Sequence, residues 1–113
     1  MTDCLFCKII AGEIPCGKVY EDEWMLAFKD INPAAPTHAL FIPKKHIANL
    51  GEMATEDQAL LGHMMSVIGK VAIELGLSEG YRVVSNCGEG AGQSVNHLHF
   101  HLLGGRNLQW PPG

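Results

Sequence analysis

The sequence predicts an α+β fold, with an antiparallel five-stranded sheet, one long helix and a short N-terminal helix. The 113-residue chain is 47% apolar and 18% charged, which suits one compact domain with a real core. Five short apolar segments end at turn residues, and one longer stretch has helical periodicity. Most connections are short, which favours antiparallel strands. We therefore expect a single domain over residues 1–113.

The expected elements follow in chain order. A short helix covers residues 3–11, with Asp3 as its N-cap and Gly12 after its end. The long helix starts at Thr55-Glu56-Asp57-Gln58, a capping-box pattern, and its apolar spacing continues to Leu75, before Gly76. Residues 86–94 contain three glycines and should form a flexible polar loop. The strands are expected at residues 17–21, 24–29, 38–42, 81–85 and 97–103.

Charge and composition exclude several function classes. The net charge is −4, from 8 basic and 12 acidic residues, which argues against a nucleic-acid groove or a basic membrane-binding face. No stretch approaches the roughly 20 apolar residues of a membrane span. Residues 1–10 lack the apolar run of a secretory signal. We expect a cytoplasmic protein with no nucleic-acid or membrane partner, whose four cysteines are thiols or metal ligands.

The sharpest chemical signal is His97-Leu98-His99-Phe100-His101. Strand side chains alternate between faces, so the three histidines should share one face. The Cα atoms of one histidine and the next should lie about 6–7 Å apart. The apolar face can pack on the long helix. Two chemistries remain open for the histidines. They can hold a catalytic zinc, or one can attack an electrophile and form a covalent intermediate.

The glycine loop directly precedes the histidines. Its glycines let backbone N–H groups approach a ligand oxygen, and Gln93 and Ser94 add polar side chains beside the histidines. A loop of this kind often forms only a turn. Its position next to His97 favours a phosphate bound against the imidazoles.

The histidine pattern, followed by Leu102 and Leu103, resembles the signature of the histidine-triad (HIT) superfamily of nucleotide hydrolases and transferases. Other segments look like its Hint branch, and the resemblance covers nearly the whole chain. It implies an HIT-like fold and a hydrolase that cleaves purine nucleoside 5′-phosphoramidates. The further matching segments are residues 28–33, 35–38, 42–47, 92–95, 103–106 and 110–113.

The resemblance also implies roles for individual residues. His99 would attack the α-phosphorus, His101 and loop N–H groups would stabilise the phosphoryl oxygens, and Ser94 would lie near the leaving group. His38 would support the triad from behind. Asp30 would bind the ribose hydroxyls, Ile31 would contact the base, and Asn86 would contact the ribose or the phosphate. The loop residues Gly92 and Gln93 would also contact the nucleotide.

Each role has a simpler alternative. Asp30 precedes Asn32-Pro33, where aspartate is common as a turn cap. Ser94 can be simply a strand-edge hydroxyl, and His38 a buried, hydrogen-bonded residue at the start of a strand. We expect no catalytic role for His63, which lies in the long helix.

Cys4 and Cys7 form a C-x-x-C pair, which alone is a weak signal for zinc or for redox chemistry. The resemblance implies a structural zinc held by Cys4, Cys7, His46 and His97, with no metal needed for the chemistry. The alternative is an apolar thiol pair on a core-facing helix. Cys16 and Cys87 have no expected role.

The resemblance implies a homodimer built by the long helix and a strand, with the tail at residues 110–113 reaching the partner's site. Three other functions stay open: cleavage of dinucleoside polyphosphates or nucleotidyl sulfates, a non-catalytic nucleotide-binding or scaffold module, and a zinc hydrolase using His97, His99 and His101. Two residues depart from the family pattern. Asn96 stands where an aromatic residue is common, and Lys29 where His or Arg is frequent.

Overall fold

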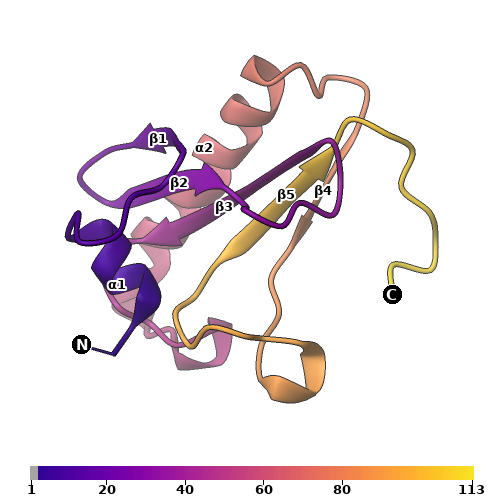
Figure 1. Ribbon diagram of the computed structural model, residues 1–113. Coiled ribbons are helices and arrows are strands. Elements are labelled where there is room, and N and C mark those ends of the chain that lie inside the picture. The colour runs from indigo at the N-terminus through magenta and orange to yellow at the C-terminus, as the bar shows by residue number, and fades with distance from the viewer. Residues whose placement is uncertain (1–2) are drawn as a thin grey trace.

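The computed structural model describes residues 3–113, so Met1 and Thr2 of the expected domain lie outside the described residues. Five strands form one antiparallel sheet in the order β1-β2-β3-β5-β4 (Figure 1). This confirms the predicted fold class. The strands are β1 (Lys18–Glu21), β2 (Met25–Lys29), β3 (Thr37–Pro43), β4 (Tyr81–Val84) and β5 (Phe100–Gly104).

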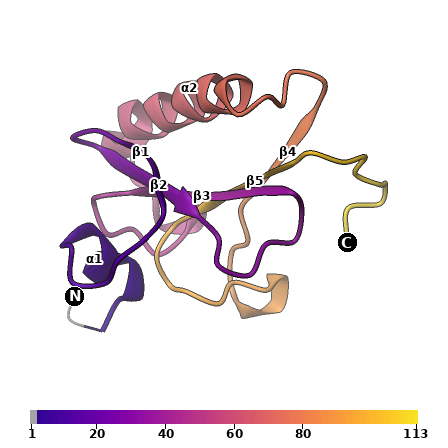
Figure 2. The same ribbon diagram turned by 45° about the horizontal axis from the view of Figure 1, so that its top comes forward.

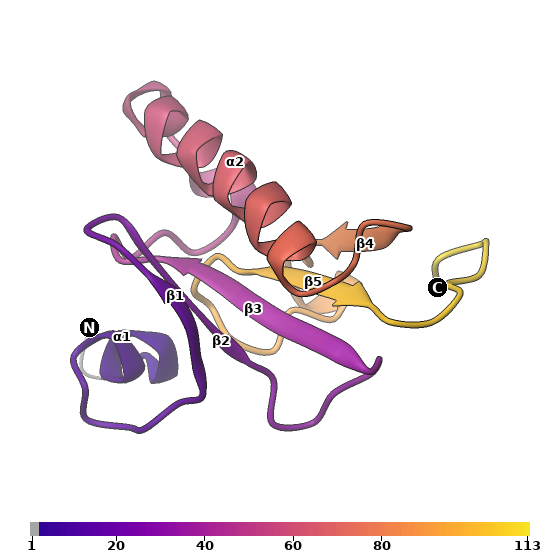
Figure 3. The same ribbon diagram turned by 90° about the horizontal axis from the view of Figure 1, so that it is seen from above.

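The two helices lie on opposite faces of the sheet (Figure 3). The long helix α2 (Gln58–Glu74) covers one face, and the short helix α1 (Leu5–Ile10) covers part of the other. Because side chains alternate along each strand, the buried apolar side chains form one cluster on each face of the sheet. The α2 side holds Met25, Ala27, Phe41, Leu98, Phe100 and Leu102 together with Met64, Val67, Ile68 and Val71. The α1 side holds Phe6, Leu26, Phe28, Leu40 and Ile42.

The histidine segment is only partly a strand. The expected strand at 97–103 begins at Phe100, because β3 pairs with β5 only as far as Phe41 opposite Phe100. The Leu98 N–H instead donates to the Ile47 carbonyl, in the connection after β3. The alternation nevertheless continues through Leu98, which is buried on the α2 side.

Both predicted helix caps are wrong in detail. Cys4, and not Asp3, is the N-cap of α1, because its Sγ accepts the Cys7 N–H at 3.3 Å. At the start of α2, the chain first makes a 3-10 turn (Thr55–Asp57), and the Asp57 carboxylate accepts the Ala54 N–H at 2.9 Å. The N-cap is therefore Ala54, one residue before Thr55, and only the Asp57 side chain takes part, because alanine has no side-chain acceptor. Gly76 ends the helix with φ +83°, as expected.

The glycine loop is more ordered than expected. It contains a short 3-10 turn (Glu89–Ala91) and lies on the α1 side of the sheet, as Figure 2 shows. Gly88 and Gly92 flank the turn with φ near +90°, a conformation that favours glycine. Within residues 3–113, no helix is both long and apolar enough to span a membrane.

Candidate functional site

His99 has its two ring nitrogens in different environments. Its Nδ1 lies 2.7 Å from the His97 carbonyl oxygen. A carbonyl only accepts, so Nδ1–H donates, and Nε2 keeps a lone pair in the neutral ring. His99 is also buried, with Phe6 against it edge-on at 5.1 Å between ring centroids. The ring is thus oriented by its own backbone and by α1, with one nitrogen free to act as a nucleophile.

His38 and His101 form a hydrogen-bonded pair with a defined direction. The Ala34 N–H donates to His38 Nδ1 at 3.0 Å, so that nitrogen carries no proton. The single ring proton of His38 is therefore on Nε2, which lies 2.9 Å from His101 Nδ1. His101 accepts at Nδ1, and its own proton is on Nε2. The pair thus leaves an N–H of His101 beside His99, whose ring centroid is 5.1 Å away.

Burial keeps His101 neutral at physiological pH. Desolvation, with smaller contributions from the neighbouring His99 and His38, lowers the pKa of His101 to about 4. The neutral ring preserves the donor–acceptor order of the pair. His101 therefore serves as a hydrogen-bond donor across the neutral range.

Asp30 lies next to this pair, at the end of β2. Its Oδ2 is 3.4 Å from His38 Nε2. Its Oδ1 accepts the Asn32 N–H at 2.8 Å, so the turn-capping alternative is present. The next residue, Ile31, is 91% exposed, which leaves it available as one wall of a binding surface. Asp30 and Ile31, which are expected at the ribose and the base, thus lie side by side at the start of the loop between β2 and β3.

The glycine-loop residues have unequal freedom. Gln93 is buried, and its side-chain amide is fully engaged within the protein: it accepts from the Gly88 N–H and donates to the Ala48 and Val95 carbonyls. It therefore holds the loop in shape. Asn86 donates to the Ala91 carbonyl across the loop. Ser94 is exposed and lines a cavity of about 760 Å³, which Cys4, Leu5 and His46 border from the other side.

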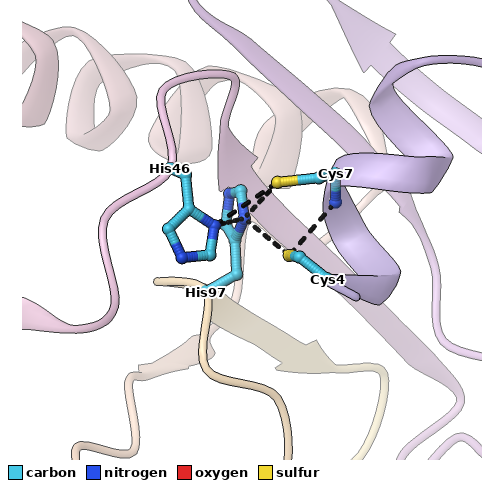
Figure 4. A group of neighbouring side chains, drawn as sticks. All are labelled: Cys4, Cys7, His46 and His97. Atoms are coloured by element: carbon cyan, nitrogen blue, oxygen red, sulfur yellow. Dashed lines mark hydrogen bonds between the residues drawn. The ribbon is translucent and has the colours of Figure 1, made fainter. Parts of the chain in front are cut away.

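A second cluster joins α1 to the rest of the fold. Cys4 and Cys7 from α1 meet His46 from the connection after β3 and His97 from the segment before β5 (Figure 4). The His97 Nδ1 lies 3.3 Å from Cys4 Sγ and 3.6 Å from Cys7 Sγ. The His46 Nδ1 lies 3.3 Å from Cys7 Sγ and 3.1 Å from His97 Nδ1. Four donor atoms therefore converge on one point.

The donor set fits a tetrahedral zinc. Ideal zinc bonds separate neighbouring sulfur and nitrogen ligands by about 3.6 Å and two nitrogens by about 3.3 Å, close to the spacings above. His97 Nε2 donates to the Pro43 carbonyl at 2.8 Å, which leaves the Nδ1 lone pair toward the cluster. Burial, with the adjacent Cys4, raises the pKa of the Cys7 thiol, so metal binding must displace a proton there.

The three triad histidines do not form one metal site. His97 points its Nδ1 into the cysteine cluster, while His99 donates its Nδ1–H to a carbonyl. Among residues 3–113, the two groups able to hold a metal are the cysteine cluster and Asp30–His38–His101, and neither includes His99. In the second group, His38 Nε2 carries the ring proton and is not free to bind a metal. The arrangement therefore does not suit a zinc held by His97, His99 and His101.

Several groups that orient the site were not predicted from the sequence. Phe6 packs edge-on against both His97 (5.9 Å) and His99 (5.1 Å). The Ala34 N–H and the Pro43 and His97 carbonyls set the ring tautomers. Nearly every residue type has the same backbone groups, so the sequence does not show which of them orient the histidine rings. The sequence held one indication of the role of Phe6, its position between Cys4 and Cys7.

His63, for which no catalytic role is expected, lies in α2 and contacts the turn between β1 and β2. Its Nε2 lies 2.6 Å from the Asp22 carboxylate, and its ring packs against Trp24. The contact fastens α2 to the turn between β1 and β2.

Comparison with known proteins gives a consistent family. The HIT domain family model matches residues 11–108. An HIT-like protein of Synechococcus elongatus is 57% identical over 98% of this chain and 97% of its own length. The crystal structure of an HIT family hydrolase from Legionella pneumophila matches with a TM-score of 0.96 at 53% identity, over 98% of this chain and 100% of that one. A histidine triad nucleotide-binding protein from Candida albicans matches with a TM-score of 0.82 at 38% identity, over 96% and 83%.

Proposed function

The chain belongs to the HIT domain family, and on this premise we propose that it is a nucleotide hydrolase that cleaves the P–N bond of purine nucleoside 5′-phosphoramidates. One observation carries the proposal: the His97 carbonyl accepts the Nδ1–H of His99, which leaves Nε2 of that ring unprotonated beside an N–H of His101. An oriented nucleophile next to a hydrogen-bond donor is what phosphoryl or nucleotidyl transfer requires.

In the proposed reaction, His99 Nε2 attacks the α-phosphorus. A bond forms between Nε2 and phosphorus as the P–N bond breaks, and the leaving nitrogen takes a proton from solvent water as the amine departs. His101 donates its Nε2–H to a non-bridging oxygen, where negative charge builds up. Water then attacks the nucleotidyl-imidazole, restores His99 and releases the nucleoside monophosphate. The neutral His101 fits this role because it still has the proton to donate.

The proposed nucleotide contacts follow the layout of the loops. Asp30 accepts hydrogen bonds from the ribose hydroxyls through oxygens that the turn does not saturate, and the exposed Ile31 contacts the base. Gly92 and the neighbouring backbone face the phosphate, with Gln93 holding the loop and Asn86 bracing it. Ser94 lies on the leaving-group side in this proposal, with its exposed hydroxyl available to the amine.

Cys4, Cys7, His46 and His97 would hold a structural zinc in this proposal. When bound, the ion would supply a cross-link between α1 and the rest of the fold, with no part in bond cleavage. The alternative of an apolar thiol pair is less favoured, because the Nδ1 atoms of His97 and His46 each lie 3.3 Å from a cysteine sulfur.

A homodimer in the cytoplasm completes the proposal, with residues 1–113 acting as one domain per chain. The edge strand β4 exposes Tyr81 and Val83, and α2 exposes Met65 and Ile73. Exposed apolar side chains on an edge strand and its neighbouring helix favour association. Sedimentation equilibrium tests this part: a monomer at all concentrations would contradict it.

The test of the function is turnover of adenosine 5′-phosphoramidate by the wild type, His99→Ala and the control His63→Ala. We expect AMP release by the wild type and the control, and a loss of roughly a thousandfold or more in His99→Ala, as for other covalent nucleophiles. A wild type that binds AMP without turnover would show a non-catalytic binding module. Faster cleavage of a dinucleoside polyphosphate or a nucleotidyl sulfate would show that the substrate class is wrong.

A further inference from the structure

Arg106 links the C-terminal segment to the loop between β2 and β3. Its Nη2 donates to the Ala34 carbonyl at 3.0 Å, and its Nη1 donates to the Asn107 carbonyl at 3.0 Å. The side chain is exposed, yet it bridges segments 72 residues apart in the sequence. Hydrogen bonds from a guanidinium are charge-assisted and stronger than those between neutral groups.

Ala34 is also the residue that sets the tautomer of His38. Its carbonyl accepts from Arg106, and its N–H donates to His38 Nδ1. His38 in turn donates to His101. A continuous series of hydrogen bonds therefore runs from Arg106 through Ala34 and His38 to the His101 ring beside the nucleophile.

The neighbouring Gly105 permits this approach. It has φ +93°, and a Cβ at this position would lie 2.8 Å from the Pro36 Cβ. The backbone before Arg106 thus lies directly against the loop that contains Ala34. With a larger residue at position 105, the segment would have to move away, and Arg106 with it.

We propose that Arg106 is a positioning residue: by holding the Ala34 carbonyl, it keeps the Ala34 N–H on His38 and so directs the His101 N–H toward the reacting phosphoryl group. Without Arg106, the loop loses this constraint, and His38 can take up its proton at Nδ1. His38 Nε2 would then accept from His101 Nδ1–H, and His101 would present a lone pair to the phosphate. The effect on turnover rests on the proposed function, whereas the tautomers can be measured without substrate.

The first experiment is ¹⁵N NMR of the imidazole nitrogens at neutral pH in the wild type, Arg106→Gln, Arg106→Lys and Arg82→Gln. Arg82 is a matched control, because its guanidinium also donates to a carbonyl of the C-terminal segment, that of Gln109 at 2.7 Å. We expect His38 and His101 to be Nε2-protonated in the wild type and in Arg82→Gln. Arg106→Gln should show both tautomers, and Arg106→Lys an intermediate state, since an ammonium can keep one bond.

The second experiment measures adenosine 5′-phosphoramidate turnover and AMP affinity in the same variants. Arg106→Gln should lower kcat about tenfold, the order expected for loss of a charge-assisted hydrogen bond, and leave the dissociation constant of AMP nearly unchanged. Arg106→Lys should recover part of kcat. Thermal denaturation of each variant verifies that it is folded.

Unchanged tautomers in folded Arg106→Gln would overturn the inference, and so would an equal change in Arg82→Gln. Shifted tautomers in a protein whose wild type never turns over the substrate would support the positioning role while refuting the proposed function. A loss confined to AMP affinity would also overturn the inference, because Arg106 would then act on the nucleoside loop and not on His101.

Discussion

Phe6→Ala tests whether α1 orients the site through packing. Phe6 is 4% exposed, with Phe28 edge-on at 5.6 Å and the rings of His97 and His99 within 6 Å. Replacing a buried phenylalanine with alanine costs about 3–5 kcal/mol. We expect that loss in zinc-loaded protein, where the cysteines keep α1 attached. In metal-free protein the same substitution should lower the free energy of unfolding by less. The six-residue helix α1 can detach there without the rest of the fold, and the loss cannot exceed the free energy of that detachment.

The assay is urea unfolding, followed by tryptophan fluorescence, of zinc-loaded and chelator-treated protein. Leu5→Ala is the control, since Leu5 is on the same helix but 44% exposed, and its loss should stay below about 1 kcal/mol. The folded Phe6→Ala variant should have a lower kcat, because the His99 ring can rotate more freely once Phe6 no longer packs against it. A loss of stability below about 1 kcal/mol in zinc-loaded Phe6→Ala would refute the packing argument.

Three further predictions follow from the structure. We expect plasma mass spectrometry to find one zinc per chain in the wild type and none in Cys7→Ser. Chelation should lower the melting temperature of the wild type only. Zinc at a thousand times its dissociation constant raises the free energy of unfolding by about 4 kcal/mol. Chelation that stops turnover in folded protein would contradict a structural zinc. His101 has its pKa lowered to about 4 by burial and by His99 and His38, so from pH 6.5 to 4 the unfolded chain binds a proton that the folded protein does not. The free energy of unfolding should therefore fall by about 1–3 kcal/mol across that range, and His101→Asn should flatten the curve; parallel curves would refute this. At Asp22, burial would raise the pKa, but hydrogen bonds from His63, Tyr20 and two backbone N–H groups outweigh it and lower the pKa to about 2. Asp22→Asn should cost about 1–2 kcal/mol above pH 4, and that difference should shrink as the pH falls toward 2, where the wild-type carboxylate begins to take up its proton; an equal cost at pH 5 and pH 2 would contradict the assignment.

Much of the fold could be predicted because it depends on local patterns. Short apolar runs in residues 24–29 and 38–42 predicted strands, which the structure buries on both faces, and helical spacing predicted α2. The boundaries were less certain. The last strand starts at Phe100 and not at His97, because the pairing with β3 ends there and no local signal marks that point.

The family resemblance named most of the candidate site, yet it could not say how the rings are oriented. Cys4, Cys7, His46 and His97 are spread over 94 positions, and only the packing of α1 on the sheet brings them together. Gln93 illustrates the opposite case. Its residue type suggested a ligand contact, whereas the fold buries it and engages its whole amide.

By itself, the sequence determined the α+β class, the shared face of the histidines and the membership of a nucleotide-related family, because periodicity and residue type are properties of the chain. The tertiary structure alone decided which nitrogen carries a proton in His38, His97 and His99. That choice depends on the Ala34 N–H and on the carbonyls of Pro43 and His97, and every residue type has such backbone groups. Their positions relative to a side chain are set by strand register and loop path, which no single segment specifies.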